Sequence, residues 1–293
     1  MTPMMLRLGK TIVNSSGIVT VSFGQTMALV PASLITSMPI GSVETITSVS
    51  IPNFYIGAME VTGALWSEVR TWALANGYTG INQGTNAGST TLPIASVRWY
   101  DVVVWLNAYS ERTGLVPVYR DSNGDVLKDG TATSTLDSAV QINSNGYRLP
   151  TANEWEMAAR WLGTTPPTVG SLATQRIATV NNGVTYYWTP GNYASGATEN
   201  TGNATETQAV AWYSANSGGA AKAVGGKRAN ALGMYDVSGN VWEWQFTSTG
   251  GINRGIRGGS WGNDSSYMIV SSVFSHAPSN IYTSIGFRLA RTQ

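Results

Sequence analysis

Apolar and small polar residues alternate along the first part of the chain, between residues 11 and 58, in stretches such as IVTVSFG and ETITSVSIPNFYIG. Alternation with a period of two, interrupted by turn residues, predicts short strands and hairpins. The period then lengthens, and the apolar residues with helical spacing are Leu65, Val69 and Trp72. Thr62 precedes them and Asn76-Gly77 follows them, so we expect a helix with an N-cap and a glycine stop.

Two more helices are predicted in the first half of the chain. Apolar residues between Trp99 and Tyr109 share one helical face, and Gly114 closes that segment. Thr151 and Glu154 have the spacing of a capping box. The apolar residues that follow them with helical spacing are Trp155, Ala158, Ala159 and Leu162. This pattern predicts a third helix with a buried stripe.

The stretch VPVYRDSNGDVLKDG between the second and third helices contains Asn123-Gly124, which favours a hairpin turn. Asp121, Asn123 and Asp125 also have the spacing of a calcium loop, but the glycine and glutamate that such a loop needs are missing. Residues 163–232 are rich in Gly, Ala, Thr, Ser and Asn and show little periodicity. We expect long surface loops with short strands there, because so few apolar residues cannot bury a layer of their own.

The last part of the chain, from MYDVSGNVWEWQF onwards, has the pattern of strands separated by glycine turns. No clear linker or internal repeat divides the chain. We therefore expect one α+β domain over residues 27–293, preceded by an extension at residues 1–26 that packs on the domain or leads into it. The tryptophans of the late motifs, together with Phe287, are predicted to be core residues: Trp242, Trp244 and Trp261.

Composition excludes several kinds of function. The formal net charge is +1, which does not favour a nucleic-acid partner. The chain has no cysteine, which excludes disulfides and thiolate chemistry, and its single histidine, His276, cannot build a multi-histidine metal centre. A Ser-His-Asp triad would depend on that one residue. No window of about 18 apolar residues predicts a membrane-spanning helix, and no signal peptide is visible.

Six motifs in the chain resemble, in order, those of the formylglycine-generating, sulfatase-modifying enzyme family: FYIGAMEVT, VRWYDVVVWLNAYSERTGLVPVY, GYRLPTANEWEMAAR, LGMYDVSGNVWEW, RGGSW and GFRLAR. They extend over roughly residues 27–291. The resemblance implies a C-type-lectin-like α+β fold of the formylglycine-generating enzyme type, with few helices, short strands and long loops.

The enzymes of that family carry two reactive cysteines after the RGGS motif. Asn263 and Met268 occupy the matching positions here, and neither can form a thiolate. A lone thioether is also a poor replacement for the two thiolates that Cu(I) prefers. The iron-dependent branch of the same fold needs several histidines. We therefore expect no enzymatic activity of the family's kind and no required cofactor.

Residues 262–286 contain no Lys, Arg, Glu, Gln or Trp, although these types occur on both sides of the segment. This composition resembles that of the variable proteins of diversity-generating retroelements, whose C-terminal lectin-fold segment is rewritten by adenine-directed mutagenesis. Such changes to Asn codons give Tyr, Ser, Asp, His, Phe, Ile, Thr, Val, Ala or Gly, so Met268 is expected at a fixed position.

The resemblance implies a variable region at about residues 262–284. The candidate variable, ligand-facing residues are Gly262, Asp264, Tyr267, Ile269, Ser272, Phe274, Ser275, His276, Asn280, Tyr282, Thr283 and Ser284. The residues assigned to the frame are Val270, Pro278, Ile285 and Phe287. Tyr and Phe supply contact area at low entropic cost, while Ser and Asn adapt their hydrogen bonds. The alternative interpretation is a core strand with ordinary surface loops.

A calcium site is a second prediction from the resemblance. In the family, the positions that match Asp236 and Glu243 bind calcium through side chains, and those that match Gly239 and Val241 bind it through carbonyls. Carboxylates and carbonyl oxygens suit a hard cation. The alternative is that both carboxylates cap turns or pair with arginine. Glu154 is assigned to the capping box, and neither it nor Glu156 is assigned a catalytic role.

The resemblance thus implies a non-enzymatic, surface-displayed binding protein, lipid-anchored in its precursor, with a diversified site. Its expected ligand is a protein or another surface-exposed macromolecule, and the protein is expected to be a monomer. The alternative is a divergent enzyme of the formylglycine-generating family with an unrecognised mechanism.

Overall fold

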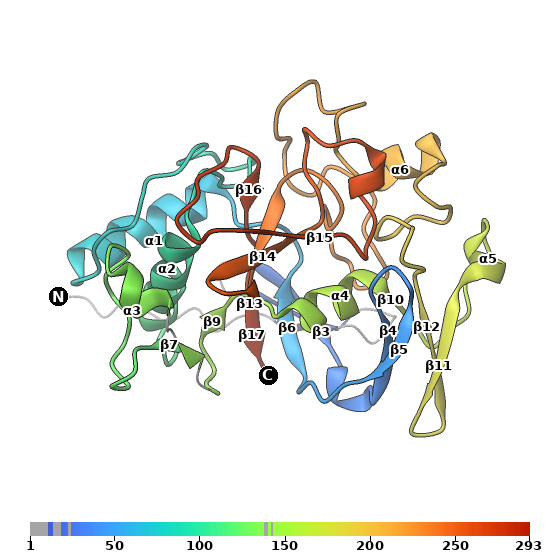
Figure 1. Ribbon diagram of the computed structural model, residues 1–293, viewed down its shortest axis with the longest axis horizontal. Coiled ribbons are helices and arrows are strands. Elements are labelled where there is room, and N and C mark those ends of the chain that lie inside the picture. The colour runs from blue at the N-terminus through green and yellow to red at the C-terminus, as the bar shows by residue number, and fades with distance from the viewer. Residues whose placement is uncertain (1–10, 14–18, 23–24, 138–139, 142) are drawn as a thin grey trace.

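The computed structural model of the protein describes residues 11–13, 19–22, 25–137, 140–141 and 143–293. The largest sheet is antiparallel and contains strands from the first and the last parts of the chain. Its strands, in spatial order, are β1 (Thr11–Val13), β2 (Val19–Ser22), β3 (Thr26–Val30), β6 (Phe54–Gly57), β17 (Ala290–Thr292) and β9 (Tyr147–Arg148). The last strand, β17, lies between β6 and β9, as Figure 1 shows.

The predicted extension at residues 1–26 is described only in part. Its described strands β1 and β2 continue the large sheet beyond β3. Residues 1–10, 14–18 and 23–24 of the predicted extension lie outside the described residues.

A second sheet carries the segment of most interest. Its strands, in spatial order, are β15 (Val273–His276), β14 (Asn253–Arg257), β13 (Trp242–Gly250) and β16 (Ile285–Gly286). The pairs are antiparallel except β13 with β16, which is parallel. β15 therefore forms one edge of this sheet.

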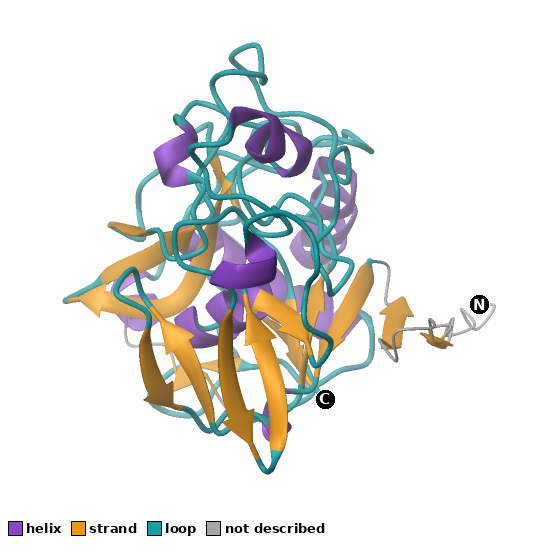
Figure 2. Ribbon diagram, turned by 90° about the vertical axis from the view of Figure 1, so that its right-hand side faces the viewer, coloured by secondary structure: helices purple, strands orange, loops and turns teal. Residues whose placement is uncertain are grey.

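The remaining strands form small sheets. One consists of β10 (Trp161–Gly163), β12 (Val184–Trp188) and β11 (Ile177–Asn181), and the two-stranded pairs are β4 (Ser37–Ile40) with β5 (Thr45–Ser48) and β7 (Tyr119–Arg120) with β8 (Val140–Gln141). Figure 2 shows strands gathered in the lower half of the molecule, with loops and short helices crowding the upper half.

The described helices are α1 (Gly63–Ala75), α2 (Trp99–Arg112), α3 (Thr133–Asp137), α4 (Ala152–Arg160), α5 (Leu172–Gln175) and α6 (Ala204–Val210), with 3₁₀ turns η1 (Ala32–Leu34) and η2 (Ser265–Tyr267). The start signals of α1 and α4 are confirmed: Thr62 caps α1, and Thr151 with Glu154 forms the capping box of α4. No helix of the described residues is long and apolar enough to cross a membrane.

The core is densest around α2, whose residues 99–110 are all buried. The Trp66 and Trp105 rings stack with 5.2 Å between centroids, and Phe287 from the end of the chain packs edge-on against both. A second core cluster surrounds α4 and includes Trp155 and Trp188. The late motif GFRLAR is therefore structural, because its phenylalanine connects the C-terminal segment to both long helices.

Some predicted details are wrong. The buried stripe of α1 runs through Trp66, Val69 and Ala73, while Leu65 and Trp72 are only half-buried. Residues 163–232 contain α5 and α6 as well as strands, and α6 begins where Asn203 accepts a hydrogen bond from the Glu206 N–H. The predicted turn at Asn123-Gly124 is confirmed, because the Asp121 carboxylate accepts the N–H groups of Asn123 and Asp125.

Candidate ligand-binding surface

The predicted variable segment crosses the exposed front of the molecule in Figure 1. It passes from η2 near α6 to β15 and continues through a loop to β16. β15 pairs with β14 in an antiparallel register, in which His276 lies opposite Arg254 and Val273 lies opposite Arg257. An edge strand and two loops thus form this surface, and the rest of the fold lies behind it.

Main-chain hydrogen bonds attach the segment to the rest of the fold. Trp99 N donates to Pro278 O at 3.1 Å, and Ser96 N donates to Tyr282 O at 3.1 Å. Trp242 N donates to Ser284 O at 2.8 Å, and Val270 N donates to Tyr193 O at 2.8 Å. Every residue type has a main-chain carbonyl, so the bonds to Pro278, Tyr282 and Ser284 do not depend on their side chains.

Most predicted ligand-facing residues reach the surface. Those that are exposed are Gly262, Asp264, Phe274, Tyr282 and Thr283, and those that are half-buried are Tyr267, Ile269, Ser275, His276, Asn280 and Ser284. The residues assigned to the frame, Val270, Pro278, Ile285 and Phe287, are all buried, and so is Met268.

Ser272 is a correction to the predicted set. It is only 8% exposed, which does not fit a ligand-facing position. Its carbonyl oxygen lies 3.5 Å from Nη1 of the buried Arg257. Val273 and Ile281 were missed, although they are 48% and 52% exposed. Both residue types belong to the set that adenine-directed changes produce, and that signal could have identified them.

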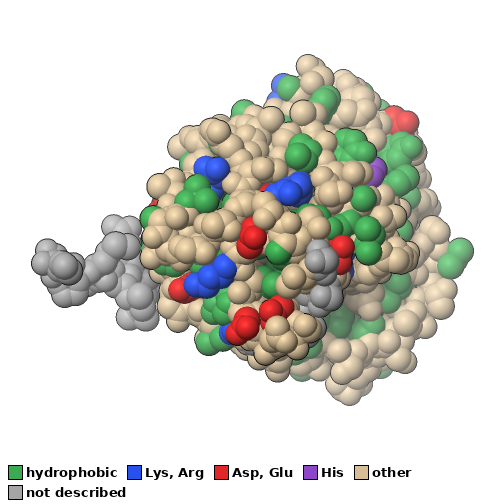
Figure 3. Space-filling model, turned by 60° about the vertical axis from the view of Figure 1, so that its left-hand side comes forward, with side chains coloured by type: hydrophobic (Ala, Val, Ile, Leu, Met, Phe, Trp, Pro, Cys, Tyr) green, Lys and Arg blue, Asp and Glu red, His purple; other side chains and the backbone are tan. Residues whose placement is uncertain are grey.

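Aromatic rings form two groups on this surface. Phe274 and Tyr267 pack together over Trp242, with centroid separations of 5.3 Å from Trp242 to Phe274 and 6.2 Å from Trp242 to Tyr267. His276 lies 4.7 Å from Tyr282. Partial burial holds the pKa of His276 below its ordinary value, so the ring is neutral at pH 7. In Figure 3 the only histidine side chain, in purple, lies among hydrophobic side chains.

Asp264 is the only acidic residue of the variable set, and it has a local structural role. Its Oδ1 accepts hydrogen bonds from Ser266 N and Ser266 Oγ at the start of η2, and these bonds hold its pKa below the ordinary value. The segment contains no Lys, Arg or Glu and no second Asp. Electrostatic attraction therefore contributes little to what this surface could bind, and contacts of rings, hydroxyls and amides remain.

The two positions that match the family's cysteines have structural roles. Asn263 Oδ1 accepts hydrogen bonds from Ser260 N at 3.0 Å and Ser260 Oγ at 2.7 Å, which closes a turn. Met268 is fully buried in a small cluster with residues such as Val210 and Tyr213. Neither side chain offers a nucleophile, so the arrangement has no counterpart of the family's thiol pair.

The predicted calcium residues lie in a buried acidic group. Glu243 Oε2 accepts hydrogen bonds from Trp155 Nε1 at 2.7 Å and Arg288 Nε at 2.6 Å, and its Oε1 accepts one from Arg288 Nη2 at 2.5 Å. Asp236 Oδ2 accepts Gly225 N at 2.6 Å. Asp236 and Gly239, in the segment between the two carboxylates, both have positive φ angles.

An arginine side chain neutralises Glu243 in this arrangement. Arg288 donates to both oxygens of the Glu243 carboxylate, and Trp155 donates to one of them. The pKa of Asp236 is raised to about 6, mainly by burial and in part by the nearby Glu243, although Gly225 and Arg288 act in the opposite direction. Glu243 pairs with arginine, as the alternative interpretation of the sequence expects, and calcium binding stays a prediction.

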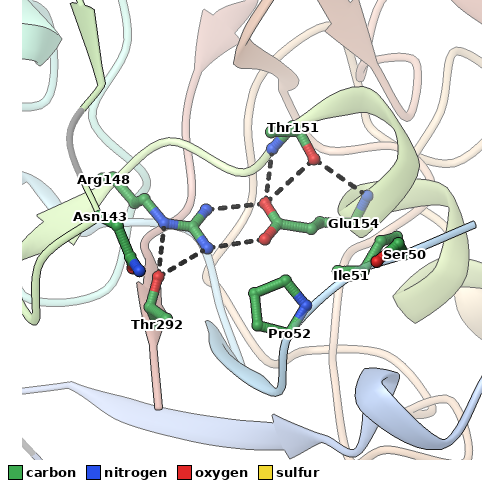
Figure 4. Close-up of a pocket in the computed structure, with 8 residues that line it drawn as sticks. All are labelled: Ser50, Ile51, Pro52, Asn143, Arg148, Thr151, Glu154 and Thr292. Atoms are coloured by element: carbon green, nitrogen blue, oxygen red, sulfur yellow. Dashed lines mark hydrogen bonds and ion pairs between the residues drawn. The ribbon is translucent and has the colours of Figure 1, made fainter.

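A shallow cavity of about 280 Å³ lies elsewhere, at the start of α4. Arg148, Thr151, Glu154, Thr292 and residues 50–52 line it (Figure 4). Arg148 Nη1 and Nη2 donate to the two Glu154 oxygens at 2.7 and 2.6 Å, and Glu154 also accepts Thr151 N. The charged groups that line the cavity pair with one another, as expected of the capping box, so we assign these residues a structural role.

Comparison with known proteins agrees with these observations. The protein is similar to Treponema denticola variable protein 1, with a TM-score of 0.66 and 26% identity over 98% of this chain and 99% of that chain. It also resembles the crystal structure of CarF, with a TM-score of 0.56 and 26% identity over 84% of this chain and 88% of that one. A Paenibacillus barcinonensis protein called chaperone protein LppX is 31% identical over 73% of this chain and 71% of its own length.

The family profile of the sulfatase-modifying factor enzyme 1-like domain matches residues 15–293. The resemblance to this family and to a variable protein, and the C-type-lectin-like α+β fold predicted from the motifs, are confirmed by these matches. The protein belongs to the sulfatase-modifying factor enzyme 1-like family.

Proposed function

We propose that the protein is a non-enzymatic ligand-binding protein whose surface at about residues 262–284 is diversified by a retroelement. The observation that carries the proposal is the attachment of this segment through its main chain, with most of the predicted side chains at the surface. A new side chain at such a position leaves the attachment intact. The similarity to Treponema denticola variable protein 1 supports the same role.

The ligand that we propose is a protein or another surface-exposed macromolecule. Aromatic side chains lose little conformational entropy when they bind. Such rings among small polar side chains are typical of surfaces that recognise proteins. Display on the cell surface, through a lipid anchor of the precursor, is the matching proposal for localisation. Its support is the likeness to Treponema denticola variable protein 1.

Two libraries test the proposal. One places the products of adenine-directed change at Asp264, Phe274, Tyr282 and Thr283, and the matched control places the same residues at Val270, Ile285 and Phe287. Truncating a large buried residue costs on the order of 3 to 5 kcal/mol, whereas surface changes stay within about 0.5 kcal/mol. We expect most members of the first library, and few of the second, to resist proteolysis. Equal losses in both libraries would contradict a variable surface.

An assay of catalysis tests the alternative of a divergent enzyme. Incubated in air with copper and a cysteine peptide derived from a sulfatase, the protein should form no formylglycine detectable by mass spectrometry. The physical reason is that Asn263 and Met268 replace the reactive thiols and that Met268 is fully buried. Turnover above a protein-free control would instead support an enzyme.

A further inference from the structure

We infer that Trp242 is the fixed floor of the diversified surface, and that small side chains at positions 267 and 274 open a slot over its ring for an aromatic or aliphatic group of a protein partner. The inference rests on the proposed function, because it takes these two positions to vary. It adds a binding residue outside the variable segment and a class of ligand group.

The contacts show one ring covered by two others. Trp242 is only 6% exposed, whereas Phe274 above it is 46% exposed. The Phe274 and Tyr267 rings meet Trp242 edge-on, at interplanar angles of 65° and 88°, and their own centroids lie 5.4 Å apart. Because both covering residues belong to the predicted variable set, the cover of Trp242 is itself open to change.

Trp242 is held in place by the frame. It opens β13 and pairs with Ile285 of β16, which is buried. Its main-chain N–H donates to Ser284 O, a bond that does not depend on the side chain at position 284. Within the described residues no hydrogen bond from its Nε1 is found, so the indole N–H remains able to donate to a ligand. A pre-positioned ring of this kind loses little conformational freedom on binding.

The side chains at positions 267 and 274 then decide what a ligand meets. With Tyr267 and Phe274, as in this chain, the surface is a closed aromatic plateau. Serine, which adenine-directed changes also produce, removes both rings and uncovers an apolar face. Aromatic groups pack favourably on a tryptophan ring in edge-on or offset arrangements, and buried apolar contact adds to the attraction. The open form should therefore accept a planar or aliphatic group.

The experiment uses indole as the probe and the double variant Tyr267→Ser/Phe274→Ser. We expect saturable binding by the double variant, at least tenfold tighter than by the unchanged protein. In NMR spectra the indole N–H signal of Trp242, assigned with Trp242→Phe, should shift on titration. The matched control is His276→Ser/Tyr282→Ser, which removes two touching rings without Trp242 beneath them. It should behave as the unchanged protein does.

Three outcomes would overturn the slot. These are no indole binding by the double variant, equal binding by the control, or loss of folding when the two rings are removed, since the rings would then be core. The proposed function fails differently. If other copies of the gene never differ at positions 267 and 274 while indole still binds the double variant, the slot stands and diversification does not.

Discussion

At the scale of single residues, Gln245 is the most unusual buried group of the second sheet. Its side chain is fully buried, and neither Oε1 nor Nε2 has a hydrogen-bond partner within the described residues. Gly255 on β14 lies against it, where an added Cβ would come within 3.2 Å of Oε1. An unpaired buried polar group costs about 1 to 3 kcal/mol.

Gln245→Met should therefore stabilise the fold. The substitution keeps the side chain's length and removes both unpaired atoms, so the free energy of unfolding should rise by about 1 kcal/mol or more. Urea denaturation at pH 7 measures the change, with Gln245→Glu as a control that adds a buried charge and should destabilise. A clear loss of stability in the Met variant would show that the amide has a bound partner such as water.

We expect Asp236 to make the stability of the fold depend on pH. Its pKa is raised from an ordinary value of 3.8 to about 6, and burial is the largest cause. A carboxyl whose pKa is raised by folding binds its proton more tightly in the folded state. This group therefore favours the folded state below about pH 4, and that contribution is lost as the pH rises towards 6.

Asp236→Asn should remove this loss of stability at higher pH. An amide keeps an oxygen for the Gly225 N–H, and asparagine tolerates the positive φ of 52° at this position. A shift of about two pKa units corresponds to about 3 kcal/mol, so the variant should be more stable than the parent at pH 8 by up to that amount. Urea midpoints at pH 4 and pH 8 test this, and a constant difference at both values would assign the effect to something other than charge.

At the scale of elements, local signals predicted the long helices well. Thr62 and Thr151 identified the starts of α1 and α4, because a cap acts through residues only three positions away. The face of α1 was predicted one position off, since Trp66 is buried by its stack on Trp105, a contact between distant segments. The α6 helix was missed because its seven residues carry no apolar stripe, and only the Asn203 cap indicated it.

The candidate site was predictable in composition but not in burial. The residue types of positions 262–284 predicted a ligand-facing segment, and most of the side chains named for it lie at the surface. Which side chains face inwards depends on β15 being an edge strand and on the buried Arg257 beneath Ser272. Neither feature has a local sequence signature, so the exposure of Val273 and the burial of Ser272 required the structure.

The motif aromatics should differ in their contribution to stability. Phe287 is fully buried against Trp66 and Trp105, whereas Trp261 is half-buried and is held by its main chain, with its N–H donating to Asn240 O. Phe287→Ala should cost about 3 to 5 kcal/mol. Trp261→Ala should cost clearly less, contrary to the expectation from sequence that both are core. Chemical denaturation compares them, and equal losses would place Trp261 in the core.

At the scale of the whole molecule, the Glu243–Arg288 pair connects three distant segments. Glu243 lies on β13, Arg288 in the C-terminal segment and Trp155 on α4, and both charged side chains are fully buried. Arg288 also donates to Gly57 O and Tyr235 O. The pair thereby joins the second sheet to the large sheet behind it, so its loss should affect the stability of the entire fold.

Breaking this pair separates a structural role from calcium binding. Removing one partner of a buried ion pair leaves an uncompensated charge and costs about 3 to 5 kcal/mol, so Glu243→Ala should destabilise the protein strongly with or without a chelator. If pairing with Arg288 is the whole role of Glu243, a calcium chelator should leave the melting temperature of the unchanged protein the same. Bound calcium would instead stabilise the folded state by about 2.7 kcal/mol at a hundredfold excess over its dissociation constant. A chelator-dependent fall in melting temperature that calcium restores, and that is absent from Glu243→Ala, would therefore establish the metal site and contradict a purely structural arginine pair.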